Sequence, residues 1–318
     1  EAEDTDPLSP GNLERLYAFG RALEGLNEVT QVRSIVNVSP DLDADTYVTL
    51  YRVPEAVTDL AVQTLLRDSV RDGAVLFLVE SDVEPFGPEA SSLVSDIRAF
   101  DPGPDVALFV DGGSAEIKDV VDSLYGRFPI VAGIVIIATY LSLLILFRSV
   151  ILPIKAILLN MMSILASYGA LVFIFQDGHF ASLLNFEPIG VIEATTPILL
   201  FSIIFGLSMD YEIFLLSRIS EAYKRSGDNT ASVAEGLKRS GGIITGAASI
   251  LIVVSLSFLV ADVVLVKAIG LGLAIAIFVD VTIVRALLAP AIMRLLGPLN
   301  WWIPRWLDRI LPRIDISP

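Results

Sequence analysis

The chain's fold is most constrained by five apolar stretches, each about twenty residues long or longer. A helix needs roughly 20 apolar residues to cross about 30 Å of hydrocarbon, and its backbone polar groups must be satisfied within the segment. The stretches therefore predict a multi-pass α-helical membrane protein with five transmembrane helices. They are residues 129–147, 151–175, 196–217, 241–261 and 264–287.

Charge divides the chain into unlike regions. Residues 1–126 contain 25 acidic and 8 basic side chains, whereas residues 127–318 contain 12 and 14. We therefore expect three parts: an acidic soluble domain at 1–126, the five-helix bundle at 127–293, and an amphipathic Trp- and Arg-rich tail at 294–318. The chain opens with acidic residues and no signal peptide, which suggests that it is part of a longer protein.

The soluble region alternates between helical and strand patterns. This order favours an α+β domain of the split-βαβ, ferredoxin-like kind. The expected helices are Asn12–Leu26, Ala56–Arg71 and Pro88–Phe100, and the expected strands are Val29–Val38, Ala74–Glu80 and Val106–Val110.

Basic side chains mark one side of the membrane. Positive residues concentrate in cytoplasmic loops, so the sequence predicts an extracytoplasmic soluble domain and a cytoplasmic C-terminus. Trp301, Trp302 and Trp306 indicate an anchor at the inner membrane interface. The basic loop and tail residues are Arg148, Lys155, Arg218, Lys224, Arg225, Lys238, Arg239, Arg294, Arg305, Arg309 and Arg313.

An aspartate interrupts the third apolar stretch, Pro197-ILLFSIIFGLSMDYEIFLLS-Arg218. A carboxylate at that depth costs about 3 kcal/mol even on a lenient scale, which favours a functional role for Asp210 over a merely satisfied polar residue. The adjacent phenol of Tyr211 either fills space or passes a proton. Glu212 points about 160° away from Asp210 and faces a cytoplasmic vestibule, or pairs with Arg218 or a neighbour.

Asp280 is the second intramembrane acid, and we expect it to act with Asp210. Arg285 is five residues further on, about 140° around an α-helix, so the two do not form an ideal pair within one helix. Arg285 therefore snorkels to the interface or meets a carboxylate of another span. Glu193, Lys267 and His179 are interpreted as interfacial or surface residues.

Several chemistries are excluded or not indicated. The chain has no cysteine and one histidine, so thiolate catalysis, disulfides and His-cluster metal sites are excluded. No P-loop or catalytic triad is visible, and we expect neither an enzyme nor a cofactor. The spacings Gly242-xxx-Gly246 and Ser163-xxx-Ser167 indicate close helix packing.

Several motifs resemble those of the MMPL (mycobacterial membrane protein large) transporters of the resistance-nodulation-division superfamily. They are Leu124-YGRFP, Phe147-RSVILPIKAILLNMMSILASYGAL, Phe205-GLSMDYEIFLLSRISEAY-Lys224, Ala234-EGLKRSGGIITGAASI and Asp280-VTIVRALLAPAIMRLLGPLNWWIPRWL. The resemblance implies that this chain is the C-terminal half of a transporter in the bacterial cytoplasmic membrane, with a ferredoxin-like porter domain.

The resemblance also implies a mechanism. Asp210 and Tyr211 match an Asp-Tyr pair that faces a second such pair in the absent N-terminal half, and Asp280 and Arg285 match polar positions of the last helix. The proton gradient would drive export of lipids or other hydrophobic compounds, with membrane lipids and a possible second copy as partners and no nucleic acid. The alternatives are an accessory motor for protein translocation of the Sec-associated type and a sterol-sensing or signalling membrane protein.

Overall fold

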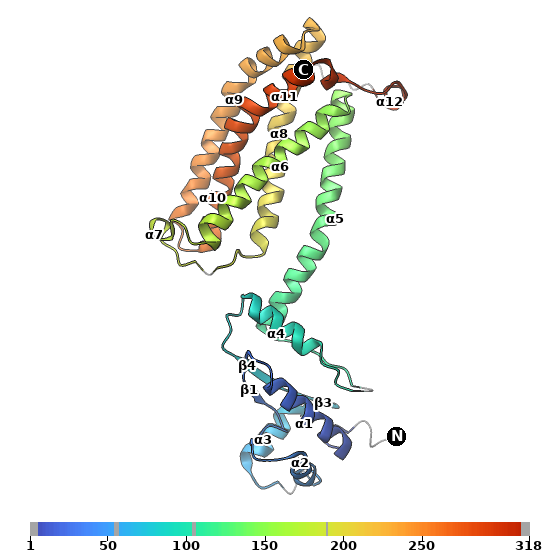
Figure 1. Ribbon diagram of the computed structural model, residues 1–318, viewed down its shortest axis with the longest axis vertical. Coiled ribbons are helices and arrows are strands. Elements are labelled where there is room, and N and C mark those ends of the chain that lie inside the picture. Colours follow the sequence, from blue (N-terminus) through green and yellow to red (C-terminus); the bar gives the residue numbers. More distant parts are fainter. Residues whose placement is uncertain (1–5, 54–56, 104–105, 189, 313–318) are drawn as a thin grey trace. The chain divides into compact units, whose positions relative to one another are not determined.

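The computed structural model describes residues 6–53, 57–103, 106–188 and 190–312. The chain forms two compact units, Glu1–Asp122 and Ser123–Pro318. Figure 1 shows the elements of both units in sequence colours. Ala56 and Arg313, which belong to an expected helix and to the expected basic tail, lie outside the described residues.

The described residues of the first unit form four helices, four short strands and the start of a fifth helix. Its strands form two separate two-stranded antiparallel sheets. In order, the elements are α1 (Pro10–Glu24), β1 (Val29–Arg33), α2 (Ala44–Leu50), α3 (Leu60–Ser69), β2 (Val70–Arg71), β3 (Ala74–Val75), β4 (Leu78–Ser81) and α4 (Pro88–Arg98).

The strands are shorter than the sequence predicts, and the expected strand over 74–80 is divided into β3 and β4. β1 pairs with β4 from Val29 opposite Ser81 to Arg33 opposite Leu78, with an irregularity after Val29. β2 and β3 form a tight hairpin through Asp72 and Gly73, both at positive φ, as hairpin turns require. The expected strand over 106–110 is wrong: these residues pair with no strand among those described.

Apolar side chains of the first unit form two clusters. One gathers around the buried rings of Tyr47 and Tyr51, and the Tyr51 hydroxyl donates to the Ile35 carbonyl at 2.6 Å. The other places Phe19 edge-on against Phe77 and Phe100. Helix α2, which the sequence analysis missed, supplies Tyr47 and begins at an Asp43 side chain that accepts from the Thr46 amide.

The second unit is helical. Five of its helices are long and apolar enough to cross a membrane, which confirms the prediction of a multi-pass helical membrane protein. The elements are α5 (Gly113–Phe147), α6 (Ile151–Leu171), η2 (Val172–Gln176), α7 (Ala181–Leu184), α8 (Thr195–Ser226), α9 (Asn229–Ser257), η3 (Phe258–Val260), α10 (Val264–Val279), η4 (Asp280–Leu288), α11 (Ala289–Leu296), η5 (Gly297–Trp301) and α12 (Arg305–Ile310).

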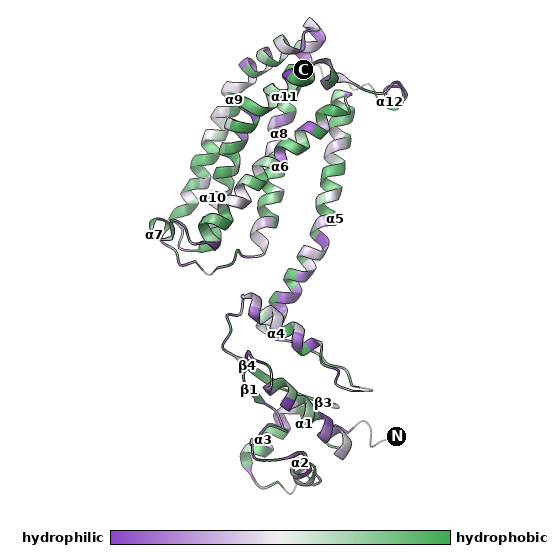
Figure 2. Cartoon of the chain, in the orientation of Figure 1, coloured by the Kyte–Doolittle hydropathy of each residue, from purple (hydrophilic) through white to green (hydrophobic). Residues whose placement is uncertain are grey.

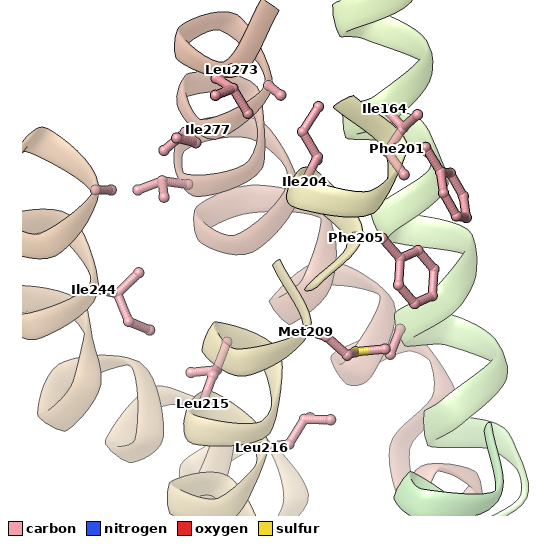
Figure 3. Packing of buried hydrophobic residues seen from close by; sticks show 14 of the residues in the cluster. Ile164, Phe201, Ile204, Phe205, Met209, Leu215, Leu216, Ile244, Leu273 and Ile277 are labelled. Atoms are coloured by element: carbon pink, nitrogen blue, oxygen red, sulfur yellow. The ribbon is translucent and has the colours of Figure 1, made fainter. Parts of the chain in front are cut away.

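Helices α6, α8, α9 and α10 lie side by side in this unit (Figure 1). Hydrophobic residues cover most of their length, and hydrophilic positions interrupt them at intervals (Figure 2). Phe201, Phe205 and Met209 recur every four residues on α8 and point to one side of it, while Ile204 points toward α10 (Figure 3). The core therefore joins α8 to neighbours on both flanks.

The tail after η4 folds back onto the bundle. Arg148, in the turn between α5 and α6, donates to the Asp308 carboxylate at 2.6 Å and to the Leu311 carbonyl at 3.1 Å. Trp301 stacks on Tyr223 with ring centroids 4.5 Å apart. Of the three tryptophans expected to form an anchor, Trp301 is thus partly buried in the bundle, and Trp302 and Trp306 are exposed.

Candidate functional site

Helix α8 presents the three consecutive residues Asp210, Tyr211 and Glu212 to different surroundings. Asp210 lies halfway along the helix and is exposed in this chain. Tyr211 is half-buried, and Glu212 is 6% exposed. Successive residues of an α-helix are about 100° apart around its axis. Asp210 therefore lies on an open face, Tyr211 at an intermediate position and Glu212 in the bundle interior.

Asp280 and Arg285 form a buried ion pair at the start of η4. The Arg285 Nε lies 2.6 Å from the Asp280 Oδ2, and both residues are under 5% exposed. The expectation that they are too far apart around the helix is wrong because residues 280–288 form a π-helix. Residues five apart are hydrogen-bonded neighbours in this geometry, so their side chains meet.

Two serines complete the surroundings of Asp280. Ser163 of α6 donates to its Oδ1 at 3.3 Å, and Ser208 of α8 donates to its Oδ2 at 3.1 Å. The Arg285 guanidinium also donates to the Ser208 carbonyl. Three segments far apart in sequence therefore converge on one carboxylate, which is stabilised in the ionised form by each of these donors.

Glu212 lies between two cations. Its Oε1 is 3.4 Å from the Lys155 Nζ, and its Oε2 is 3.8 Å from the Arg285 Nη1. Lys155 is 5% exposed, so counting it among the interfacial loop charges was wrong. Glu212 does pair with neighbours on other elements, whereas Arg218 pairs with Glu221.

Tyr211 connects the exposed and buried parts of the site. The Cζ of Arg285 lies 5.5 Å from the centre of the Tyr211 ring, within the range of a cation–π contact. The exposed carboxylate of Asp210 is on the adjacent residue. The structure therefore brings Tyr211, Glu212, Asp280 and Arg285 together and leaves Asp210 on the open face of α8.

The remaining polar residues of the spans have structural contacts. Glu193 accepts from the Thr195 and Thr196 amides at the start of α8, at 3.0 and 3.1 Å. Lys267, in the first turn of α10, is 3% exposed and donates to the Leu184 and Asn185 carbonyls, so protein carbonyls and not water solvate it. His179 is exposed and stacks on a phenylalanine ring.

Small residues make one of the two expected close contacts. The Ser167 hydroxyl donates to the Gly272 carbonyl at 2.8 Å, and a Cβ on Gly272 would lie 2.8 Å from Leu200. Gly242 and Gly246, by contrast, have open space where a Cβ would be. Ser167 thus lies at a close contact between α6 and α10, and Ser163, one turn earlier on the same face, contacts Asp280.

Sequence reasoning missed Lys155, Ser163 and Ser208 as members of the site. Lys155 carried a usable signal, because it lies in the second turn of a long apolar helix and needs a partner there. The two serines carried none, since single hydroxyls are common in membrane helices. Among the described residues, no group of three His, Cys, Asp or Glu side chains is arranged to hold a metal ion.

Comparison with known proteins places the chain. A family model described as "MMPL family" matches residues 24–313. The chain belongs to the MMPL family. Several relatives are named as exporters, transport proteins or uptake proteins and not as enzymes. With its five apolar helices, this MMPL chain is an integral membrane protein.

Three relatives illustrate the similarity. The mycolic acid-containing lipids exporter MmpL11 of Mycolicibacterium smegmatis is 39% identical over 269 residues, 84% of this chain and 28% of the relative. The trehalose monomycolate exporter MmpL3 of the same organism is 38% identical over 229 residues, 72% of this chain and 22% of the relative. MmpL11 of Mycobacterium tuberculosis, named a heme uptake protein, is 41% identical over 248 residues, 77% of this chain and 26% of the relative. The chain thus spans less than a third of these relatives' lengths.

Proposed function

We propose that this chain is part of a proton-motive-force-driven transporter that exports lipids or other hydrophobic compounds. Two of the relatives above are named as lipid exporters, and the third is named for heme, another largely apolar compound. The proton gradient supplies the energy, with no bound cofactor. Asp210, Tyr211 and Asp280 carry the proton, with Glu212 and Arg285 in support.

The observation that carries this proposal is the Asp280–Arg285 ion pair in the bundle interior. Burying two charges is expensive, and a hydrophobic pair of similar volume would serve stability as well or better. Ionisable groups inside a membrane protein commonly mark proton or ion pathways. The pair adjoins Tyr211 through the guanidinium, so the exposed Asp210 lies one residue from a buried charged network.

Protonation offers a physical route to coupling. A carboxylate that gains a proton loses its attraction for Arg285, so the contacts between α6, α8 and η4 change. Packed helices respond by small shifts or by rigid-body motion of whole elements. Such a shift, repeated in each cycle, is the link between proton entry and substrate movement.

The wider architecture follows from the same proposal. The protein lies in the bacterial cytoplasmic membrane, with residues 1–126 as an extracytoplasmic, ferredoxin-like porter domain and the C-terminus in the cytoplasm. The open face of α8 around Asp210 meets an Asp-Tyr pair of the transporter's N-terminal half. Its other partners are membrane lipids, the hydrophobic substrate and a possible second copy; nucleic acid is not one of them.

Replacing Asp210 by Asn in the full-length protein tests the relay. We expect transport of a fluorescent lipid into inverted vesicles to fall to background, because the amide cannot ionise, while expression and membrane insertion stay at wild-type levels. Asp262→Asn, at an exposed carboxylate outside the spans, is the matched control and should export normally. Undiminished, uncoupler-sensitive export by Asp210→Asn would refute the proposed relay. Cross-links from the N-terminal unit to exported polypeptide instead of lipid would favour the translocation motor.

A further inference from the structure

The proposed relay gives Lys155, one member of a buried charge cluster, no role, and it leaves the supporting role of Glu212 unspecified. Lys155, Glu212, Asp280 and Arg285 comprise two cations and two carboxylates, and all four are at least 94% buried. Their formal charges cancel, as expected where an unbalanced charge would be costly. Asp280 and Arg285 make a close pair, whereas Lys155 and Glu212 are held by longer contacts.

Three buried polar atoms of this cluster have no hydrogen-bond partner among the described residues: the Lys155 Nζ, the Glu212 Oε1 and the Arg285 Nη1. Each faces an opposite charge at 3.4 or 3.8 Å, slightly beyond a good hydrogen bond. By contrast, both oxygens of Asp280 accept hydrogen bonds. The cluster is therefore tight on the Asp280 side and incomplete on the Glu212 side.

We infer that Lys155 and Glu212 are positioning residues that give Arg285 a second carboxylate. When Asp280 binds a proton, the ion pair of Arg285 passes from Asp280 to Glu212, and it returns when the proton leaves. Lys155, 3.4 Å from the Glu212 carboxylate, stays beside it in both states. This inference rests on the proposed proton-coupled function. It gives Lys155 a role and specifies how Glu212 supports the relay.

The chemistry around Asp280 fits the first step. One proton adds to a carboxylate oxygen, and the hydroxyls of Ser163 and Ser208, which donate to the carboxylate, can turn to accept from the acid. Asp280 can thus be neutral without losing its partners. The cluster then holds two cations and one carboxylate, and Glu212 is the only ionised carboxylate that the described contacts place beside Arg285.

The π-helix fits the second step. η4 holds Asp280 and Arg285 together only because its hydrogen bonds join residues five apart. Returning this segment to α-helical geometry would turn the two side chains about 140° apart. π-helical turns are rare and concentrate at functional sites. The position of η4 at the ion pair therefore fits a segment that changes its hydrogen-bond register when the pair breaks.

The groups that face Glu212 come from three elements. Lys155 approaches from α6, Arg285 and Asp280 approach from η4, and Tyr211 and Asp210 neighbour it on α8. Glu212 is the one ionic partner of Lys155 among the described residues. The Lys155 ammonium therefore depends on Glu212, which explains how a lysine is retained at this depth.

Two changes in the full-length protein test the inference. Glu212→Asp preserves every charge but withdraws the carboxylate by one methylene, beyond the reach of Arg285. We expect proton-driven export to fall by about tenfold and its pH profile to shift, at wild-type expression and thermal stability. Glu221→Asp, at an exposed carboxylate on the same helix, is the control and should change neither.

The double variant Lys155→Gln/Glu212→Gln separates positioning from stability. It removes one charge of each sign and keeps the Asp280–Arg285 pair, so insertion and thermal stability should be retained while export is lost. Wild-type export and pH profile in either variant would overturn the inference. Asp210→Asn, assayed in parallel, distinguishes the failures: if it abolishes export while both Glu212 variants are normal, the relay stands and only this inference is wrong.

Discussion

Ion pairs in the two units of the chain occupy opposite surroundings. In the first unit, Arg33 and Glu80 pair across β1 and β4 at 2.8 Å, with side chains 54% and 44% exposed. In the bundle, Arg285 and Asp280 pair at 2.6 Å with side chains 4% and 5% exposed. Water screens the first pair and makes it nearly dispensable, whereas the second must be satisfied by protein alone. Similar contact distances therefore carry very different energies.

The largest expected effect comes from removing Arg285. Arg285→Met leaves Asp280 and Glu212 buried with only Lys155 as a cation, and we expect a loss of about 3–5 kcal/mol in unfolding free energy. The measurement is unfolding by SDS in mixed micelles. Arg33→Met, which breaks the exposed pair, is the control and should cost at most about 1 kcal/mol. Equal losses in the two variants would contradict the comparison.

Packing provides a second contrast between the units. A Cβ on Gly270 would lie 2.5 Å from the Ser255 carbonyl and 2.6 Å from the Phe258 Cβ, so Gly270→Ala forces α9 or η3 away from α10. We expect a loss of about 2 kcal/mol by the same assay. In Gly20→Ala the obstacle is the end of the Asn37 side chain, which can rotate. A larger loss for Gly20→Ala than for Gly270→Ala would show that the bundle is the more adaptable unit.

The smallest expected effect concerns an exposed carboxylate in the first unit. Hydrogen bonds from the Thr46 hydroxyl and amide hold the pKa of Asp43 below its ordinary value. Its contribution to folding is therefore complete above the unfolded-state pKa, about 3.9, and is lost as the pH falls through the lower folded-state pKa.

Hydrogen exchange of the amides in α2 measures this contribution. Asp43→Ala should speed exchange at neutral pH, and the difference from wild type should vanish in acid. Asp41→Ala, two residues earlier and outside the cap, should show no such pH dependence. A constant difference between Asp43→Ala and wild type at every pH would exclude the charged cap as its cause.

The sequence predicted the apolar helices of the bundle well because a segment that crosses a lipid bilayer must be apolar over about twenty residues. Each expected span lies within or almost coincides with a long apolar helix, although α5 and α8 extend well beyond the hydrophobic stretches. Polar residues at their ends continue the helix without lowering its stability, so composition alone does not mark where the helix stops. The strand over 106–110 failed because apolar alternation needs a pairing partner, which no pattern supplies.

The sequence named Tyr211, Glu212, Asp280 and Arg285, which the structure brings together, but it did not predict their arrangement. Asp210, Tyr211 and Asp280 were identified by the cost of polar groups in an apolar segment. The sequence analysis assumed an α-helix, in which Asp280 and Arg285 are not an ideal pair. No residue pattern over 280–288 indicates the π-helix that brings them together. Lys155 was assigned to a loop because its partner, Glu212, is 57 positions away in the sequence and was itself matched with a nearer arginine.

The contact between Arg148 and the tail has a practical consequence for handling the protein. One guanidinium binds the Asp308 side chain and main-chain carbonyls at 308, 311 and 312, so the last described residues are attached to the turn between α5 and α6. Truncation before Asp308 would leave a partly buried arginine with none of these acceptors. A fluorescent label fused after residue 312 would therefore lie close to the turn between α5 and α6. A purification tag at the same place would compete with residues 308–312 for the Arg148 guanidinium.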